Sequence, residues 1–348
     1  MRKSWLVIRP RQLPMSFHLN QRVPTVLLVL GFVTLIAIVL NVGQGDYPIP
    51  PLDIVKTILG LPSDNPDYAF IINTLRLPRT LVALAAGVGL ALSGTILQGL
   101  TRNPLADPGI IGVNAGAGVT AVTLIVFFPN VPLFVLPLSA FVGALTVAIL
   151  IYLMAWDQGS APLRLILMGV GLAALLNALT TLIITFGEIN SVSQALVWLA
   201  GSVYGRSWEH LGVMLPWLGV FVPLSFVLAM PLNALSLGDD MAKGLGTRVE
   251  RQRGLLLLGS AAMAGVAVAV AGTLGFVGLI APHLGRQLVG PTHEGLLPTA
   301  ALIGGIIVVL ADWLGRVLFA PIELPCGVVT AAIGTPYFLY LLIRNRKQ

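Results

Sequence analysis

Charged residues and cysteine are both scarce in this sequence. Of its 348 residues, 20 are basic and 14 are acidic, so charged types make up 10% of the chain and apolar types 56%. An ordinary soluble domain carries roughly 25% charged residues. The composition therefore excludes a soluble globular protein, a disordered chain and a nucleic-acid-binding protein. The single cysteine, Cys326, excludes an intramolecular disulfide and a cysteine metal cluster.

The sequence also lacks the motifs of intramembrane chemistry. It contains neither H-E-x-x-H nor G-x-S-x-G, and its four histidines have no metal-ligand spacing. The apolar runs carry no acidic residue in their centres, which disfavours a proton or sodium relay, although backbone carbonyls could still bind sodium. None of the four lysines lies in a P-loop. We therefore expect no catalytic residue, metal site or cofactor in this chain, and any ATPase to be a separate polypeptide.

Long charge-free runs dominate what is present. A membrane-spanning helix needs about 20 apolar residues, and the runs predict an all-α polytopic protein with ten transmembrane helices. The runs are 23–45, 80–101, 108–156 (two helices divided at 129–132), 165–187, 211–238, 254–271, a shorter 276–290, 296–318 and 324–343. The first run is longer than a signal-peptide core and no A-x-A site follows it, so we expect a retained span. A further run, 191–203, is too short to cross.

Basic residues predict the orientation. With ten helices and a cytoplasmic N-terminus, fifteen basic residues fall inside and five outside, as the positive-inside rule requires. The predicted organisation is a cytoplasmic segment over 1–22, one transmembrane domain over 23–343 and a cytoplasmic tail over 344–348. The five outside residues are Lys56, Arg76, Arg79, Arg206 and Arg316.

Several long motifs follow one another in a specific order. They are RLPRT at 76–80, RNPLADPG at 102–109, GVNAGA at 112–117, GFVGLIAPH at 275–283 and ELPCGVVT at 323–330. Over about residues 25–343 the chain resembles the FecCD family, the permease subunits of type II ABC importers for iron-siderophores, haem and cobalamin. The resemblance implies an inner-membrane permease with a second permease subunit, identical or related, two ATP-binding cassette subunits and an extracytoplasmic binding protein. It implies a ferric siderophore as substrate, with cobalamin or haem as alternatives. An ATP-independent channel or an ion-coupled carrier is the alternative from another class.

The resemblance also implies residue roles at the two membrane surfaces. On the outside, Arg76, Arg79 and Arg316 match arginines that dock glutamates of the binding protein; the alternative is interfacial snorkelling of their side chains. On the inside, the segment 236–252 resembles the family's coupling loop, for which we expect a short helix, a sharp turn and a second short helix. The residues assigned to ATPase coupling are Gly238, Asp239, Asp240, Lys243, Gly244, Gly246 and Arg248.

The remaining roles concern the transport route. The resemblance implies a cytoplasmic gate at Asn103, Pro104 and Leu105, with Ser160 and Ala161 as its other part. An ordinary turn explains Asn103 equally well. We expect the translocation path to pass Ser191, Ser193 and Gln194 at its polar outer mouth. Farther along the path we expect Thr330, Thr335 and Tyr337. A path lined by small polar and apolar side chains suits conduction, because it binds the ligand weakly enough for the ligand to leave as well as enter.

Overall fold

The computed structural model describes residues 5–8, 17–45, 47–63, 65–128, 131–132, 134–155 and 162–345. Two short antiparallel strands, β1 (Trp5–Ile8) and β2 (Phe17–Asn20), pair Trp5 with Asn20 ahead of the first helix. The sequence analysis did not anticipate this ribbon. All other regular elements in the described ranges are helical.

The helices follow the charge-free runs along the chain. Their bounds are α1 Arg22–Gly43, α2 Pro51–Ile58, α3 Asp67–Phe70, the π-helical η1 Ile71–Arg76, α4 Leu77–Thr101, the 3-10 helix η2 Pro108–Ile111, α5 Val113–Phe127, α6 Val135–Met154, α7 Pro162–Thr185, α8 Ile189–Ala200, α9 Trp208–Val227, α10 Ala229–Ser236, α11 Asp239–Gly244, α12 Val249–Ala271, α13 Val277–Val289, α14 His293–Val317 and α15 Cys326–Asn345.

Eight described helices are long and apolar enough to cross a membrane. The helices in the two other predicted spans, α5 and α13, have 15 and 13 residues. Helix α5 starts later than its run because Gly112, just before it, adopts positive φ, whereas α13 agrees with the predicted 276–290 after the break that begins at Gly272, which also has positive φ. The helical polytopic fold is confirmed, whereas the count of ten crossings stays a prediction.

Two expected helix boundaries were wrong. The second span begins long before residue 80, because α3, η1 and α4 form one continuous helical stretch of 35 residues, Asp67–Thr101. At 1.5 Å per residue that is roughly 50 Å, longer than the hydrocarbon core. A charge-free run therefore marks the membrane-crossing part of a helix and misses the part beyond it. The run 211–238 is divided at Leu228 into α9 and α10.

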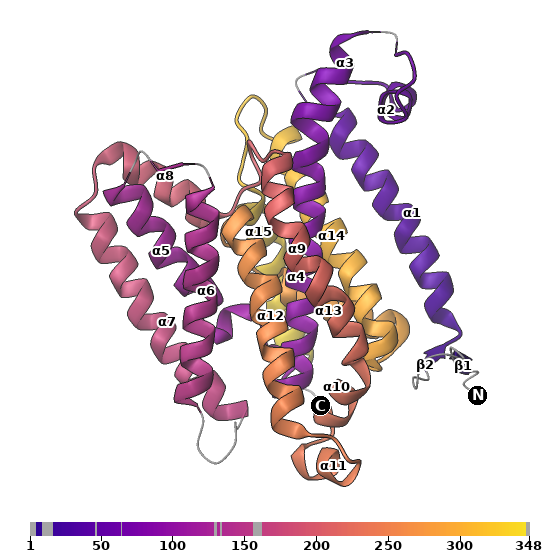
Figure 1. Ribbon diagram of the computed structural model, residues 1–348. Coiled ribbons are helices and arrows are strands. Elements are labelled where there is room, and N and C mark those ends of the chain that lie inside the picture. Colours follow the sequence, from indigo (N-terminus) through magenta and orange to yellow (C-terminus); the bar gives the residue numbers. More distant parts are fainter. Residues whose placement is uncertain are drawn as a thin grey trace.

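Helix α4 lies at the centre of the bundle and packs against α14, α12, α13 and α9 (Figure 1). Glycines let the backbones approach closely. A methyl group at Gly87 would overlap the carbonyl of Gly304, and one at Gly94 would overlap the carbonyl of Gly278. Small residues at such contacts allow close van der Waals packing, which holds helices together in lipid, where no hydrophobic driving force acts between them.

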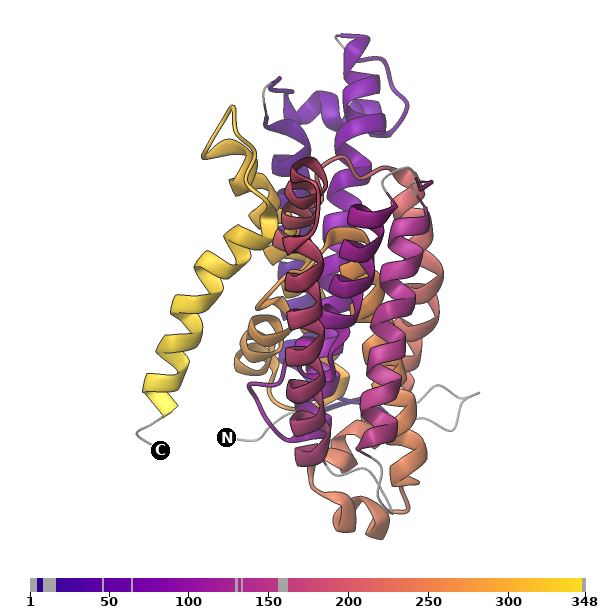
Figure 2. The same cartoon turned by 90° about the vertical axis from the view of Figure 1, so that its left-hand side faces the viewer.

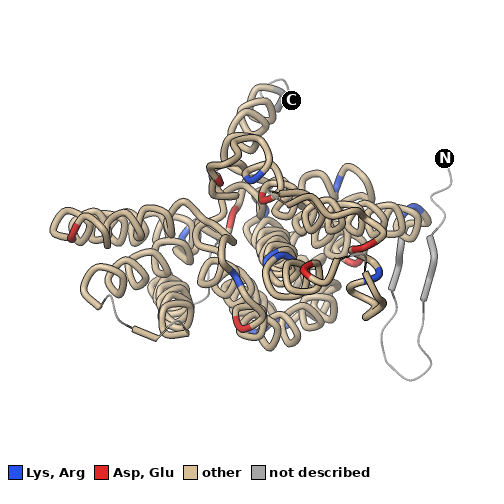
Figure 3. Tube along the Cα trace, turned by 90° about the horizontal axis from the view of Figure 1, so that it is seen from above, with Lys and Arg blue, Asp and Glu red and all other residues tan. Residues whose placement is uncertain are grey.

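Helices α5 to α8 form a second group beside this centre (Figure 1), and α15 projects away from the bundle (Figures 2 and 3). We call the end that carries α11 the inner end, and the end that carries α2, α3 and α8 the outer end. Helix α1 starts at the inner end and α15 runs down toward it, as an even number of crossings requires. Few helical stretches in Figure 3 carry charge, which agrees with the composition.

Candidate functional site

A polar cluster fills the outer end between α1, α4 and α14. The Arg79 guanidinium donates through Nε and Nη2 to the Asp312 carboxylate, with Nη2 to Oδ1 at 2.8 Å, and through Nη1 to Glu323 Oε2 at 2.9 Å. Asn41 Nδ2 donates to Asp312 Oδ2 at 3.1 Å, and Thr80 Oγ1 donates to Asn41 Oδ1 at 2.7 Å. Side chains far apart in the sequence thus join three helices.

Arg76 and Arg316 belong to the same end. Arg76 donates to the carbonyl oxygens of Val42 and Tyr47, both at 2.8 Å, and Arg316 donates to the carbonyl of Asn41. All three outer arginines are buried, with at most 9% of each residue exposed. Arg76 ends η1 and Arg79 lies in the first turn of α4, so both lie inside the helical stretch, ahead of the run that the sequence analysis began at residue 80. Their outer position matches the sequence analysis, but their side chains satisfy internal acceptors, and docking stays a prediction.

At the inner end, α11 presents an exposed surface. Lys243, Gly244, Gly246 and Arg248 are exposed, and so are the apolar side chains of Met241 in α11 and of Leu237 and Leu245 on its flanks. Gly238 and Gly246 have φ of 113° and 80°, which only glycine adopts easily. The expected second short helix is absent from this described segment: the chain turns after Leu245 and enters the first turn of the long helix α12 at Val249. Exposed apolar groups on a charged loop are typical of a protein-binding surface.

A residue that the sequence analysis missed anchors this surface. The Arg253 side chain, 2% exposed, donates through Nη2 to Asp239 Oδ1 at 2.6 Å and through Nη1 to Glu250 Oε1 at 3.2 Å. Asp239 starts α11, while Glu250 and Arg253 belong to α12. Two charge-assisted bonds therefore fasten α11 to α12. The i,i+3 pair Glu250–Arg253 was visible in the sequence, but nothing in the sequence indicated the longer contact to Asp239.

The first predicted gate segment is a compact turn. Asn103 Oδ1 accepts the backbone N–H of Leu105 at 2.9 Å, and the Asn103 carbonyl accepts that of Ala106 at 3.1 Å. Pro104 lies exposed between them. The Asn103 side chain therefore caps its own turn. Ser160 and Ala161, the other predicted gate residues, lie outside the described residues.

The predicted path residues fall in two places. Ser193 and Gln194 of α8 line a cavity of about 340 Å³ at the outer end, whereas Ser191 is buried. On α15, Thr330 and Tyr337 line a second, apolar cavity of about 300 Å³ against α13 and α14. Thr335 is exposed. No described cavity joins these two groups, so the path through them stays a prediction.

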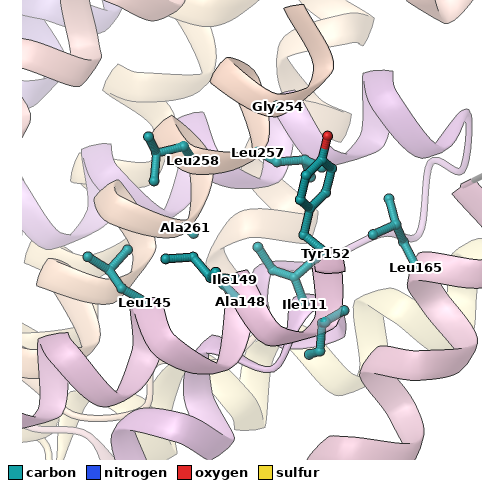
Figure 4. Close-up of a pocket in the computed structure, with 11 residues that line it drawn as sticks. Ile111, Leu145, Ala148, Ile149, Tyr152, Leu165, Gly254, Leu257, Leu258 and Ala261 are labelled. Atoms are coloured by element: carbon teal, nitrogen blue, oxygen red, sulfur yellow. The ribbon is translucent and has the colours of Figure 1, made fainter. Parts of the chain in front are cut away.

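A third cavity, of about 180 Å³, lies between α6 and α12 (Figure 4). Its lining is apolar except for the hydroxyl of Tyr152, the one oxygen among the side chains drawn there. A specific binding site needs several convergent polar groups. We therefore assign it no role in transport.

Comparison with known proteins identifies the family of this chain. The model of the "FecCD transport family" matches residues 33–344. The chain belongs to this family. It is 46% identical to the "Probable siderophore transport system permease protein YfhA" of Bacillus subtilis (strain 168), covering 93% of this chain and 95% of that one. It is 43% identical to the "Fe(3+)-citrate import system permease protein YfmE" of the same strain, covering 92% and 96%.

A solved structure shares the fold. It is described as "An inward-facing conformation of a putative metal-chelate type ABC transporter", with a TM-score of 0.83, 34% identity, and coverage of 92% of this chain and 99% of that one. This FecCD family protein is thus an ABC-type permease, a transport subunit and a multi-pass protein of the bacterial inner membrane.

Proposed function

We propose that this chain is a permease subunit of an ATP-driven importer and translocates a metal chelate, with a ferric siderophore as the substrate. The observation that carries the proposal is the family match over nearly the whole chain, together with relatives named for siderophore and Fe(3+)-citrate import. Cobalamin and haem are the alternatives within the family. The proposal assigns this chain no catalytic residue, metal or cofactor.

Features of the inner end favour ATP hydrolysis by separate subunits. The sequence has no P-loop, while Met241 of α11 and Leu245 just after it are exposed beside Lys243. We propose that two ATP-binding cassette subunits bind this segment, and that its attachment through Arg253 passes their movement to α12. The turn at Asn103, Pro104 and Leu105 would then serve as part of the cytoplasmic gate, together with Ser160 and Ala161.

The outer end and α15 offer surfaces for the binding protein and for a second permease subunit. Docking of a binding protein through Arg76, Arg79 and Arg316 requires these guanidinium groups to exchange internal acceptors for glutamates of the partner, and Arg79 already has one partly exposed acid partner in Glu323. A second permease subunit, identical or related, would cover α15, which projects from the bundle and exposes apolar side chains. The path would run between the two subunits past Ser191, Ser193, Gln194, Thr330, Thr335 and Tyr337.

Uptake in a strain lacking this chain tests the substrate. Labelled ferric siderophore, cobalamin and haem are supplied separately, and we expect only the ferric siderophore to depend on the chain. If only cobalamin uptake or only haem uptake were lost, that compound would be the substrate in place of the ferric siderophore. Reconstitution tests the energy source: accumulation against a gradient by the purified chain alone would contradict the proposal and favour an ion-coupled carrier.

A further inference from the structure

One arginine, Arg206, lines two adjoining cavities at the outer end. The first, of about 340 Å³, is lined by α8 and the segment 201–206, and the second, of about 190 Å³, extends toward α9. They share Ile125, Leu136, Gln194, Trp198 and Arg206 in their linings. The first lies within the range of small-molecule sites, about 300–1,000 Å³.

Arg206 is partly exposed, and it differs in its partners from the buried arginines of the described chain. Arg79 and Arg253 each pair with two carboxylates, and Arg76 and Arg316 donate to backbone carbonyls. The guanidinium of Arg206 has one recorded side-chain contact, Nη1 to the His210 ring nitrogen Nε2 at 3.3 Å, and its Nε is buried with no acceptor. Burial without a compensating anion lowers the pKa of the Arg206 guanidinium.

A second donor without an acceptor lies in the same lining. Trp198 is 7% exposed, and its indole Nε1 has no hydrogen-bond partner in the described structure. An indole nitrogen can only donate. A buried donor that makes no hydrogen bond costs free energy. Two such donors in one lining therefore indicate an acceptor that the chain itself does not provide.

No carboxylate of the described residues lines either cavity. The acid closest in sequence, Glu209, is exposed on α9, and Asp312 and Glu323 already bind Arg79. The surrounding side chains are neutral, and several, such as Trp198 and Tyr204, offer aromatic surface to an organic ligand. Arg79 lies nearby, with its guanidinium carbon 5.5 Å from the centre of the Tyr204 ring, but Asp312 and Glu323 balance its charge, so Arg206 is the cation available to a ligand in these cavities.

We propose that these cavities bind a free carboxylate of the transported ferric chelate, with Arg206 and the Trp198 indole N–H as its donors. The inference rests on the proposed function, and it narrows the substrate to chelates that carry a carboxylate not used by the metal. The arginine fork matches a carboxylate in a bidentate geometry. Ser193 and Gln194, predicted at the mouth of the path, line the same cavity, so the carboxylate would be held where the chelate enters.

The test is binding to the purified full-length chain in lipid nanodiscs, measured by equilibrium dialysis. The probes are radiolabelled ferric citrate, inorganic phosphate, and a ferric trihydroxamate that has no carboxylate. We expect ferric citrate to bind, and Arg206→Gln to weaken it by about tenfold or more. Arg206→Lys should retain part of the affinity, and Trp198→Phe, which keeps the ring and removes the donor, should weaken binding severalfold.

Lys56→Gln is the matched control, since it also removes one positive charge at the outer end but lies outside both cavities. We expect it to bind ferric citrate like the unaltered chain. Affinity of Arg206→Gln within twofold of the unaltered chain would overturn the proposal. So would equal binding of phosphate, which would indicate a small-anion site, or equally Arg206-dependent binding of the trihydroxamate.

The binding result is independent of the uptake result. If ferric citrate binds through Arg206 while the deletion strain still imports every ferric chelate normally, the site stands and the proposed function fails. If uptake depends on the chain but Arg206→Gln leaves ferric citrate binding unchanged, the function stands and the carboxylate site fails.

Discussion

The two carboxylates that bind Arg79 should contribute unequally to stability. Asp312 has 3% of its side chain exposed and Glu323 has 29%, while the Arg79 side chain is 10% exposed. Breaking a buried ion pair by removing one partner costs about 3–5 kcal/mol, whereas an exposed pair contributes about 0.2–1 kcal/mol. Asp312→Asn still leaves Glu323 beside the guanidinium, so we expect a loss near the lower limit, about 3 kcal/mol. Glu323→Gln should cost below about 1 kcal/mol.

The assay is reversible unfolding of the purified chain in mixed lipid–detergent micelles with increasing dodecyl sulfate, followed by circular dichroism. The two variants change the same chemical group to its amide against the same arginine, so each is the control of the other. Equal losses, or a larger loss for Glu323→Gln, would refute the argument that burial decides the strength of this cluster.

The remaining predictions concern partners and packing. Glu323→Gln should raise the affinity of a purified binding protein severalfold if Arg79 docks it, because an internal competitor is removed; an unchanged or lower affinity in a titration would count against docking. Gly244→Phe should leave folding intact, since Gly244 is exposed and an added Cβ there meets nothing within 4 Å, but should separate ATP hydrolysis from uptake in vesicles; normal coupled uptake would reject the α11 assignment. Gly94→Ala should destabilise the chain by about 1–3 kcal/mol through overlap with α13, whereas Gly219→Ala, in open space, should be neutral in the same unfolding assay.

The helical fold was predictable because membrane crossing requires long apolar runs, and those runs contain the helices. Their ends were less predictable. The Asp67–Thr101 stretch is longer than the hydrocarbon core, and the part outside the core can contain polar and charged residues and still be helical, so hydropathy alone did not locate its start. The division at Leu228 between α9 and α10 likewise has no signal in hydropathy.

Charge counting identified residues of the outer end but not their contacts. It placed Arg79 and Arg316 outside, yet the partners of Arg79 lie 233 and 244 positions away in the sequence. Only the packing of α4 against α14 brings them together. Arg206 was counted with the same group, and nothing in the sequence distinguished its incomplete pairing from the saturated guanidinium of Arg79. Helix packing was similarly hidden: the close approach of Gly87 to Gly304 joins two helices, and no spacing within one helix reveals it.

Helix α12 is fastened at both of its ends. At the inner end Arg253 binds it to α11, and at the outer end the Ala271 carbonyl accepts the N–H of Ser202 at 2.7 Å. Just beyond that end, Thr273 donates to the carbonyl of Leu199. Helix α12 runs without interruption over 23 residues between these two attachments. In the proposed importer, a displacement that the ATPase subunits impose on α11 would therefore pass through α12 to the segment that holds Trp198 and Arg206, and would link nucleotide hydrolysis at one end to substrate release at the other.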